Sequence, residues 1–290
     1  WKDDKFITIH EEKIEFDYIL IASGAASGRN SQKNNVHDIN TFLTISGSEL
    51  LNRSLETIDQ EKPYISVVGG GATGIQFLFE IAHFIKRKKM ECGLRLIHSS
   101  ERVLQQFPEG FSEYTEARMS NLDIDFQQNT YYQEQAENSI FLKSKETKKE
   151  FELPSKITLL FLGNNPGKRL SANTFGQVII NNQPIRNIFI AGDCSNYDSC
   201  GSNTMSAQSS VRKGRLAACN ILRDSSILKI FEPYLHQDLG YVISLGPKDA
   251  VGWLAVENNV VGGTPALLLK ETVESQYDLL LATGIDTYLM

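Results

Sequence analysis

Short continuous apolar runs alternate along the chain with longer segments in which apolar residues recur every three or four positions. A run of strand length without polar alternation is typical of a strand covered on both faces, and such runs occupy residues 18–22, 64–68, 94–97, 157–162 and 188–191. The recurring spacing predicts helices with one apolar face, at residues 48–60, 75–85, 112–122, 206–222 and 266–282. Strands that alternate with helices indicate an α/β fold with parallel sheets.

Weaker patterns complete the expected elements. The chain opens with a predicted hairpin that leads into the strand at 18–22, and residues 138–153 form a second hairpin pattern with a lysine-rich turn, which we interpret as a solvated tip. Residues 25–40 are polar, and we expect them to be irregular. Further short strands are expected at residues 124–126, 178–180 and 241–244.

Composition narrows the class of protein. A chain of 290 residues suits about two domains, and 41% hydrophobic with 22% charged residues is ordinary for a globular protein. The formal net charge of −6 argues against nucleic acid as the main partner, because phosphate binding needs a basic face. No apolar run reaches the length of about 18 residues that a membrane-spanning helix needs.

The cysteines do not indicate a metal site. The chain has four, and they form neither a CxxC pair nor a cluster with histidines at zinc-binding spacing. So few cysteines in a chain of this length fit a reducing compartment, which predicts a cytoplasmic location.

The strongest chemical signal is the segment Gly69-Gly70-Gly71-Ala72-Thr73-Gly74, which follows a predicted strand and opens a predicted helix. It has the GxGxxG spacing of turns that bind a dinucleotide pyrophosphate. Gly69 would permit the tight turn, Gly71 the approach of the pyrophosphate, and Gly74 close packing of the helix on the strand. The phosphates would lie at the helix N-terminus beside Ala72, where free N–H groups favour anions. The alternative is a glycine-rich turn without a ligand.

The residue that should distinguish the two nicotinamide dinucleotides is unusual. An acid at the end of the strand 94–97 would hold the ribose 2′-hydroxyl of NADH, whereas a cation would suit the 2′-phosphate of NADPH. His98 stands there instead, with Glu101 and Arg102 close behind. The choice between NADH and NADPH therefore stays open.

A second signal is Asn187-Ile188-Phe189-Ile190-Ala191-Gly192-Asp193, in which a buried strand delivers Asp193 beside Gly192. In open α/β sheets ligands bind at the carboxyl ends of the strands. A carboxylate there could accept hydrogen bonds from sugar-like hydroxyls. On local sequence alone, an aspartate that caps the next turn is an equal alternative.

Three segments in order resemble the pyridine-nucleotide-dependent FAD oxidoreductases. The strand that ends at Ala22-Ser23-Gly24 resembles their "ATG" strand, the glycine-rich turn their nucleotide-binding motif, and Ala191-Gly192-Asp193 their flavin motif. The resemblance implies two Rossmann-like dinucleotide-binding domains, one inserted in the other, with a C-terminal cap. It also implies FAD and NAD(P)H as cofactors, with Gly24 near the FAD and Asp193 on its ribityl chain.

Within that superfamily the C-terminal half is most similar to type II NADH:quinone dehydrogenases. Ala207-Gln208-Ser209-Ser210-Val211-Arg212-Lys213 resembles their AQxAxxQ segment beside the flavin and the quinone, with Lys213 in place of the second glutamine. The resemblance therefore implies that Ala207 and Gln208 contact the flavin and that Gln208 and Lys213 lie on the quinone side. Gly163 resembles a glycine on the nicotinamide side.

Two departures from the family pattern bear on activity. Gln76 replaces a glutamate near the nicotinamide, and it can still hydrogen-bond a carboxamide but carries no charge. The glycine-rich motif that grips the ADP half of FAD should precede residue 1, and it does not occur in this sequence. We therefore expect the chain to be a fragment that binds FAD poorly.

The resemblance predicts a division of the chain into parts. An FAD-binding domain would comprise residues 1–40 and 166–235, an NAD(P)H-binding domain residues 41–165, and a cap or interface segment residues 236–290. The predicted reaction passes hydride from nicotinamide to flavin and electrons on to a quinone or another small acceptor. The cofactors carry this chemistry, so no side chain is predicted to be catalytic.

Two rival functions stay open. One is a flavin reductase with a ferredoxin or sulfur acceptor, for which Cys194 and Cys200 near the flavin motif are the argument, although free thiols are the plainer interpretation. The other is a redox-inactive nucleotide-binding module, which Gln76 and the missing motif suggest.

The C-terminal helix bears on location and partners. In the family this end lies on the inner face of the membrane. Its polar face here is largely acidic, which suits anionic lipid poorly, so packing against the body of the protein or in a homodimer is an equal alternative.

Overall fold

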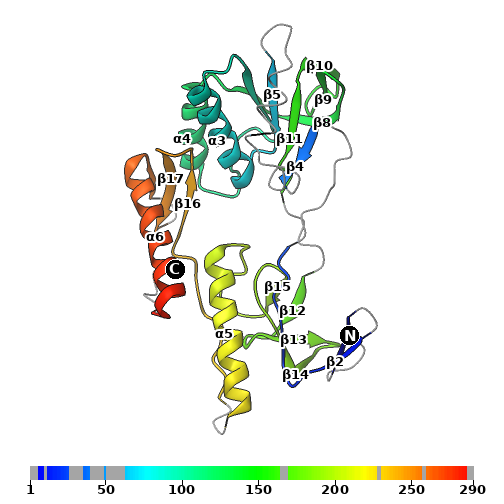
Figure 1. Ribbon diagram of the computed structural model, residues 1–290, viewed down its shortest axis with the longest axis vertical. Coiled ribbons are helices and arrows are strands. Elements are labelled where there is room, and N and C mark those ends of the chain that lie inside the picture. Colours follow the sequence, from blue (N-terminus) through cyan, green and yellow to red (C-terminus); the bar gives the residue numbers. More distant parts are fainter. Residues whose placement is uncertain are drawn as a thin grey trace. The chain divides into compact units, whose positions relative to one another are not determined.

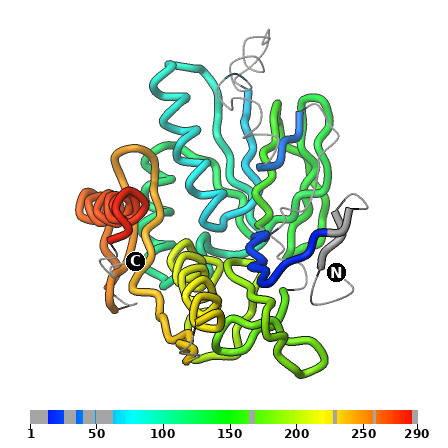
Figure 2. Tube along the Cα trace, turned by 60° about the horizontal axis from the view of Figure 1, so that its bottom comes forward, coloured from blue at the N-terminus to red at the C-terminus, as the bar shows by residue number. Residues whose placement is uncertain are grey.

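The computed structural model describes residues 6–9, 12–25, 35–39, 49, 63–163, 169–226, 230–256 and 259–285. The chain forms two compact units, and the colours of Figures 1 and 2 show that each is built from segments far apart in sequence. Unit 1 comprises Trp1–Ala26 and Asn164–Asp238, and unit 2 comprises Ser27–Gly163 and Leu239–Met290. The helix expected at 48–60 lies outside the described residues, apart from Glu49.

The central sheet of unit 2 has five parallel strands in the described part of the chain, in the order β4-β11-β5-β6-β7. From β5 the chain winds outward through β6 to β7, whereas β11 and β4 lie on the other side of β5. The winding therefore reverses between β5 and β11, which is where open α/β sheets bind ligands. The strands are β4 (Val36–Asp38), β5 (Tyr64–Val68), β6 (Gly93–Ile97), β7 (Asp125–Gln127) and β11 (Ile157–Leu160).

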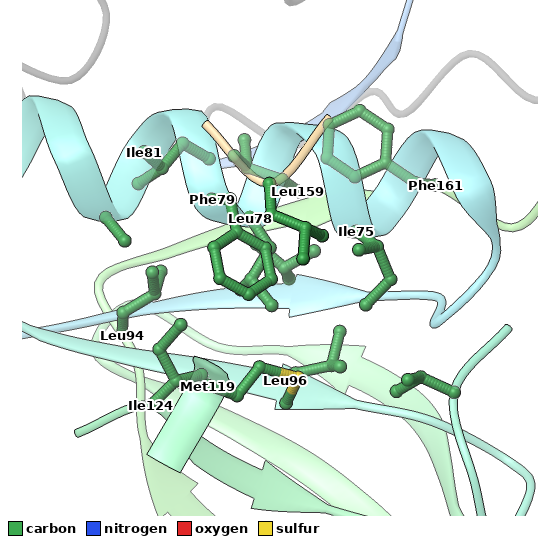
Figure 3. Packing of buried hydrophobic residues seen from close by; sticks show 14 of the residues in the cluster. Ile75, Leu78, Phe79, Ile81, Leu94, Leu96, Met119, Ile124, Leu159 and Phe161 are labelled. Atoms are coloured by element: carbon green, nitrogen blue, oxygen red, sulfur yellow. The ribbon is translucent and has the colours of Figure 1, made fainter. Parts of the chain in front are cut away.

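Helix α3 (Ala72–Lys88) supplies much of the core of unit 2. Its apolar side chains, at helical spacing, pack against residues of β6 and β11 such as Leu96 and Leu159 (Figure 3). Full burial of one such side chain contributes about 1.5–3 kcal/mol. The helix ends where Lys89 adopts a left-handed conformation with φ 55°. Helix α4 (Glu109–Ser120) adds Phe111 and Met119 to the same core.

Two antiparallel sheets complete unit 2. One has the order β10-β9-β8, and the other, β16-β17-β18, is followed by α6. The bounds are β8 (Thr130–Gln135), β9 (Ser139–Ser144), β10 (Glu150–Pro154), β16 (Gly240–Ser244), β17 (Ala250–Leu254), β18 (Val260–Gly262) and α6 (Thr264–Thr283). Asp249 joins this second sheet to α4, because it accepts a hydrogen bond from Tyr114 at 2.9 Å and pairs with Arg118 at 2.7 Å. Leu239–Met290, the greater part of the segment 236–290 for which a cap or interface role is expected, belongs to unit 2.

Unit 1 contains a five-stranded sheet in the order β15-β12-β13-β14-β3, in which β14 runs parallel to β3. Helix α5 (Ala207–Ser225) contacts β14 and buries one face that includes Leu216 and Ala217. The strands are β3 (Ile19–Ile21), β12 (Leu170–Ala172), β13 (Gln177–Ile180), β14 (Gln183–Ile190) and β15 (Ser195–Tyr197), and the expected N-terminal hairpin is β1 (Phe6–Ile9) with β2 (Glu12–Glu15).

The long patterned elements within the described residues lie where the sequence predicts them, but several short strands differ from the prediction. Residues 25–40 are not wholly irregular, because β4 lies buried among them; its polar His37 and Asp38 hide it from a search for apolar runs. The strand at 18–22 is not covered on both faces, because the side chain of Leu20 in β3 is 38% exposed. Five further short strands, β8, β12, β15, β17 and β18, were not expected.

Candidate functional site

The glycine-rich turn of unit 2 joins β5 to α3 at the point where the sheet reverses its winding. Gly69 has φ +116°, its N–H donates to the Ile97 carbonyl at 2.9 Å, and a Cβ there would overlap the Phe161 carbonyl oxygen. At Gly74 a Cβ would overlap the Gly69 carbonyl oxygen. At Gly71, by contrast, the nearest atom to a Cβ is the Gln106 Nε2 at 4.0 Å. Two glycines thus shape the turn, and the third leaves space beside it.

The helix N-terminus beside that space is open to an anion. No side chain caps α3 at Gly71, and its first turn contains no acidic residue. The first N–H groups of a helix have no partner within the helix, and its dipole favours negative charge there. A phosphate group could approach these N–H groups over Gly71 and Ala72 without displacing a side chain.

His98 follows β6 and closes one side of the turn. Its Nδ1 accepts a hydrogen bond from the Gly70 N–H at 3.1 Å, and its ring lies so near the Gly70 Cα that a Cβ there would be 2.8 Å from the ring. Burial, together with the positive charge of Lys145, lowers the pKa of His98 below its ordinary value. The neutral ring accepts at Nδ1, so Nε2 carries the proton and acts as a donor.

The loop after His98 also reaches the turn, which the sequence did not indicate. The Leu104 N–H donates to the Gly70 carbonyl at 2.8 Å, and Leu104 is fully buried with φ 54°. Arg102 fixes the loop by donating to the Ser112 hydroxyl at 2.6 Å. The exposed side chain of Gln106, in the same loop, lies beside Gly71. Gln106 belongs to no recognisable motif, so only its position in the fold makes it a candidate.

Gln76 and Gly163 lie near the same edge of the sheet. Gln76 is half-buried in the first two turns of α3, and Gly163, with φ +83°, follows the carboxyl end of β11. The rings of Phe77 and Phe161 stack with centroids 4.8 Å apart and hold the end of β11 against α3. The fold therefore gathers Gln76, Gly163, His98 and the glycine-rich turn at one end of the parallel sheet.

In unit 1, Asp193 and Gly24 follow the carboxyl ends of two neighbouring parallel strands. The Ala191 N–H donates to the Ile21 carbonyl at 2.9 Å, which continues the pairing of β14 with β3. Gly24 and Gly192 have φ +67° and +74°, so both turns require the left-handed region. The Asp193 carboxylate accepts from the Ser210 hydroxyl at 3.1 Å and thereby contacts the first turn of α5.

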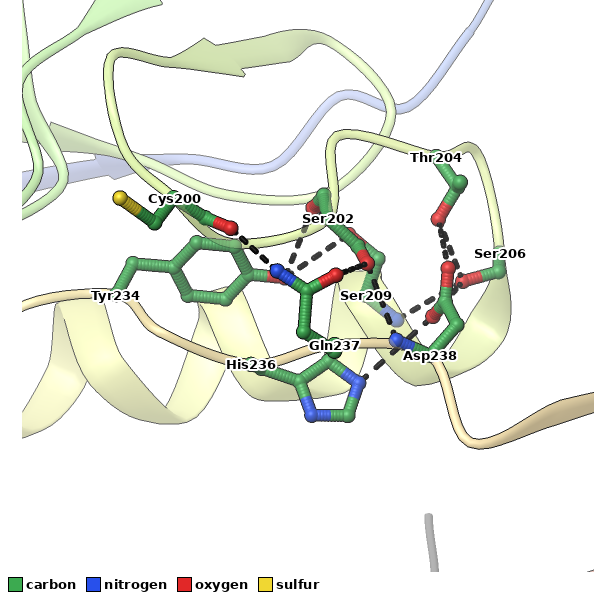
Figure 4. A network of polar contacts seen from close by, with 9 residues as sticks. All are labelled: Cys200, Ser202, Thr204, Ser206, Ser209, Tyr234, His236, Gln237 and Asp238. Carbon is green, nitrogen blue, oxygen red and sulfur yellow. Dashed lines mark hydrogen bonds and ion pairs between the residues drawn. The ribbon is translucent and has the colours of Figure 1, made fainter. Parts of the chain in front are cut away.

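The first turn of α5 is held by a polar network (Figure 4). The Ser206 hydroxyl caps the helix by accepting from the Ser209 N–H at 3.0 Å. Asp238, whose side chain is 8% exposed, accepts from Thr204 at 2.6 Å and from Ser206 at 3.1 Å. Burial favours a raised pKa for Asp238, but the interaction with His236, 3.7 Å away, and the hydrogen bonds from Thr204 and Ser206 outweigh it and lower that pKa below its ordinary value.

Tyr234 fastens the rest of this segment to the loop before α5. Its buried hydroxyl donates to the Ser202 carbonyl at 3.0 Å and lies 3.1 Å from the Ser209 hydroxyl. The Asp238 N–H donates to the Ser202 hydroxyl at 3.0 Å. None of these residues was a sequence candidate, because the partners are about 30 positions apart and form no motif.

The predicted site residues of α5 differ in how far they are buried. Ala207 is exposed and Gln208 is half-buried, both in the first turn. Lys213 is 1% exposed, and its ammonium group donates to the Asn203 side chain at 3.0 Å and lies over the rings of Tyr197 and Tyr234. Burial, together with the charge of Arg169, lowers the pKa of Lys213 to about 8.

Other chemistry is not supported in the part of the chain that the structure describes. The four cysteines are free thiols, and no group of three acidic, histidine or cysteine side chains could hold a metal ion. Of the helices in that part, none combines the length and apolarity that crossing a membrane requires.

The switch-point turn, the open helix N-terminus and the carboxylate after parallel strands together define a dinucleotide-binding α/β protein. The chain belongs to the pyridine nucleotide-disulphide oxidoreductase family, which it matches over residues 2–214. This finding confirms the superfamily that the three motifs indicate.

Two curated relatives are both named as oxidoreductases of a nicotinamide dinucleotide and a quinone. One is the type II NADH:quinone oxidoreductase of Haemophilus influenzae, 25% identical over 290 aligned positions, which cover 83% of this chain and 63% of that protein. The other is the mitochondrial external alternative NAD(P)H-ubiquinone oxidoreductase B2 of Arabidopsis thaliana, 23% identical over 156 positions, which cover 47% of this chain and 27% of that protein. The chain thus spans less than two thirds of either relative.

Solved structures confirm the fold class. The structure of NDH2 from Plasmodium falciparum in complex with NADH is similar to this chain, with a TM-score of 0.75 at 17% identity. The match covers 93% of this chain and 77% of the NDH2 chain. The complex of the same enzyme with RYL-552 matches with a TM-score of 0.73 at 16% identity. The α/β fold predicted from the alternation of strands and helices is therefore confirmed.

Proposed function

We propose that this chain acts as an FAD-dependent NAD(P)H dehydrogenase that passes electrons to a quinone. In this proposal unit 2 binds NAD(P)H and unit 1 binds FAD. Family membership and the names of the two curated relatives support the proposal. The observation that carries it is the glycine-rich turn at the winding reversal of unit 2.

The residues of unit 2 fit NAD(P)H. The pyrophosphate would lie on the first N–H groups of α3, in the space that Gly71 leaves open. Gln106 could donate to the same phosphates, and His98 would face the adenosine ribose. Gln76 and Gly163, at the ends of neighbouring elements, would hold the nicotinamide amide. Gln76 can donate and accept hydrogen bonds, which a carboxamide requires.

The residues of unit 1 fit the ribityl end of FAD. Asp193 uses one oxygen for the Ser210 hydroxyl, and a carboxylate has acceptor capacity left for sugar-like hydroxyls. Gly24 has nothing within 4 Å of the position of a Cβ, so a ligand could approach its backbone. We therefore propose Gly24, Gly192 and Asp193 as flavin-binding residues, with Ala207 and Gln208 at the start of α5.

When bound, the flavin and nicotinamide would supply the hydride and electron transfer, and the side chains would bind and orient them. On this proposal Gln208 faces the acceptor end. Lys213 acts there indirectly, because its buried ammonium group holds Asn203 in the loop that leads to Gln208. The Asp238 network would keep the same helix end in place.

Spectroscopy of the full chain tests the proposal. The chain is mixed with FAD, freed of excess, and its flavin absorbance is followed anaerobically after addition of NADH or NADPH and then of a soluble quinone. We expect flavin absorbance that is bleached by the dinucleotide and restored by the quinone. A chain that binds dinucleotide but gives no bound flavin with added FAD would contradict the proposal and favour the redox-inactive module. Bleaching without restoration by quinone would favour a reductase with another acceptor.

We also propose that the protein associates peripherally with a membrane through α6. This helix buries only Ala266 among its described residues and exposes Leu268, Leu279 and Leu281. Its acidic residues suit anionic lipid poorly. Sedimentation with neutral and anionic vesicles should therefore show stronger binding to neutral ones. A Leu268→Gln, Leu279→Gln double variant, which changes two exposed leucines on the same face of the helix, should lose this binding. A dimer in solution without vesicle binding would contradict this proposal.

A further inference from the structure

The chemistry at the carboxyl end of β6 decides which nicotinamide dinucleotide the site accepts. A carboxylate in this position accepts hydrogen bonds from the ribose hydroxyls of NADH and repels a 2′-phosphate. His98 cannot do either, because its Nδ1 already accepts the Gly70 N–H at 3.1 Å. The remaining ring nitrogen can only donate. A donor can bind a hydroxyl oxygen, but it suits the oxygens of a phosphate better.

Backbone hydrogen bonds hold the main chain of Lys145 near the end of β6, where His98 lies. The His98 carbonyl accepts from the Thr130 N–H at 2.9 Å, which brings the segment after β7 to the end of β6. In that segment Asn129, with φ 50°, donates its N–H to the Ser100 carbonyl at 3.1 Å and accepts the Lys145 N–H at 2.7 Å. Asn129 therefore joins the loop after β6 to the turn between β9 and β10.

The side chain of Asn129 strengthens this connection by donating to Glu146 at 3.0 Å. The exposed turn 144–149 that it holds contains three lysines against one glutamate. Lys145 is near enough for its charge to act on the His98 ring. The lysine-rich turn, a solvated tip by sequence, is thus fixed in position beside the end of β6.

The two acidic residues of this region, Glu101 and Glu146, are outnumbered by Arg102 and the three lysines of the turn. Glu101 is exposed, and its neighbour Arg102 carries the opposite charge. Arg102 itself donates to Ser112 at 2.6 Å and to the loop carbonyls of Gln105 and Phe107, so its position on the loop is fixed. Lys145, whose side chain is exposed and whose main chain is joined to Asn129, has a cation that can move toward a ligand.

We infer that His98 and Lys145 form a subsite for the 2′-phosphate of NADPH, so that the chain binds NADPH at least as tightly as NADH. This inference rests on the proposed function, because it assumes that the glycine-rich turn binds a dinucleotide. His98 contributes a neutral donor, and Lys145 contributes a charge. Both come from elements that the sequence places about 47 positions apart and that Asn129 joins.

Direct binding measures the inference without any redox reaction. Dissociation constants of NADH and NADPH are determined for the full chain by calorimetry at about 0.15 M salt, where screening removes long-range attraction. The fragments 5′-AMP and 2′,5′-ADP isolate the adenosine end. We expect NADPH to bind at least as tightly as NADH, and 2′,5′-ADP to bind more tightly than 5′-AMP.

Variants assign the effect to residues. Lys145→Ala should weaken NADPH binding about tenfold, the usual loss for one charge-assisted hydrogen bond, and leave NADH nearly unchanged. Lys143→Ala is the matched control, because Lys143 lies in the same hairpin but is paired with Glu150 at 3.2 Å. His98→Glu should reverse the preference toward NADH. If His98→Glu does not fold, Lys145→Glu on the exposed turn replaces it and should lower only NADPH affinity.

The outcomes separate this inference from the proposed function. Tighter binding of NADH than of NADPH by the unaltered chain would overturn the 2′-phosphate subsite and leave the proposed function intact. An equal loss of both dinucleotides in Lys145→Ala would also overturn it. Binding of neither dinucleotide would overturn the proposed function and the inference with it.

Discussion

In unit 2 the glycine-rich turn is shaped by backbone atoms, whereas in unit 1 the start of α5 is shaped by side chains. Gly69 and Gly74 face carbonyl oxygens that leave no room for a Cβ. Around α5, by contrast, Asp238 accepts hydrogen bonds from Thr204 and Ser206, and Ser206 in turn caps the helix. The first arrangement tolerates almost no substitution, while the second can lose one bond at a time.

On the proposed function, the difference follows from the ligand that each site would bind. A pyrophosphate is held by backbone N–H groups at a helix end, so the backbone must approach closely and only glycine allows it. A hydroxylated chain is held by a carboxylate, which other side chains must orient. The five variants below test this contrast. Gly71→Ala is paired with Gly74→Val as its matched variant, and the others follow from the largest expected effect to the smallest.

Gly74→Val should have the largest effect. The new side chain would overlap the Gly69 carbonyl oxygen, so α3 would move away from β5. We expect a loss of about 3 kcal/mol or more in the free energy of unfolding, together with loss of dinucleotide binding. Urea denaturation and calorimetry measure the two effects.

Gly71→Ala is the matched variant, because a Cβ there would meet only Gln106 at 4.0 Å. It should fold with nearly unchanged stability yet bind dinucleotide about tenfold more weakly, a loss of about 1.4 kcal/mol. If both variants lost the same free energy of unfolding, Gly74 could not be said to shape the turn while Gly71 only leaves space beside it.

Asp193→Ala should weaken FAD binding about 10-fold to 100-fold, because the ribityl hydroxyls would lose a charged acceptor. Its effect on unfolding should be small, since the carboxylate makes one hydrogen bond, with Ser210 at 3.1 Å. Fluorescence titration with FAD measures the first quantity. The control Ser210→Ala removes the same bond and keeps the carboxylate, so an equal loss of FAD affinity in both variants would contradict a direct role for Asp193.

Asp238→Asn should lower the free energy of unfolding by about 1–2 kcal/mol at neutral pH, because two hydroxyl donors lose a charged partner. Hydrogen bonds hold the pKa of Asp238 below its ordinary 3.8 in the folded state. The stability that it contributes is therefore present above pH 3.8 and is lost as the pH falls through the folded-state pKa. The difference in Tm between the unaltered protein and Asp238→Asn should stay constant from neutral pH to about pH 4 and shrink below it. A difference in Tm that stays constant at lower pH would refute the stabilising role of the Asp238 carboxylate.

Lys213→Met should have the smallest effect at neutral pH, within about 1 kcal/mol, because removing a buried charge offsets the lost bond to Asn203. The pKa of Lys213 falls from 10.5 to about 8 on folding, so the unfolded chain binds more protons between these values. The original protein should therefore gain stability relative to Lys213→Met as the pH rises from about 8 to 10.5. If the free energies of unfolding of the two proteins changed equally with pH across that range, the lowered pKa of a buried Lys213 amine would be contradicted.

The sequence predicts the backbone-shaped site better than the one shaped by side chains. Gly69, Gly71 and Gly74 lie within one short segment, and each has a steric role that spacing alone reveals. Asp193 could be found because a glycine and a strand precede it. Tyr234 and Asp238 could not, because their partners lie across a long loop and the chemistry of a serine or threonine hydroxyl leaves no pattern.

At His98 and Lys213 the sequence indicates only part of the chemistry. The lack of an acid at His98 is visible in the sequence, but the hydrogen bond that fixes its proton on Nε2 depends on the path of the turn at Gly70. The burial of Lys213 was not visible, because lysine seldom lies inside a protein and the ring contacts come from β15 and the segment after α5. In both cases a neighbour distant in sequence decides the chemistry of the side chain.

The interleaved path of the chain has a consequence for biosynthesis. β5, α3, β6, α4 and β7 follow one another directly, so the centre of the unit 2 sheet can form while the chain is still emerging from the ribosome. Unit 1 has to wait, because β3 pairs with β14, at Ile19 with Ile188, and the Tyr18 hydroxyl reaches Asp224 across 206 positions. Contacts over such separations form slowly. A nascent chain should therefore spend its longest partly folded interval with β3 unpaired, when a chaperone or an identical strand from a neighbouring chain could capture it.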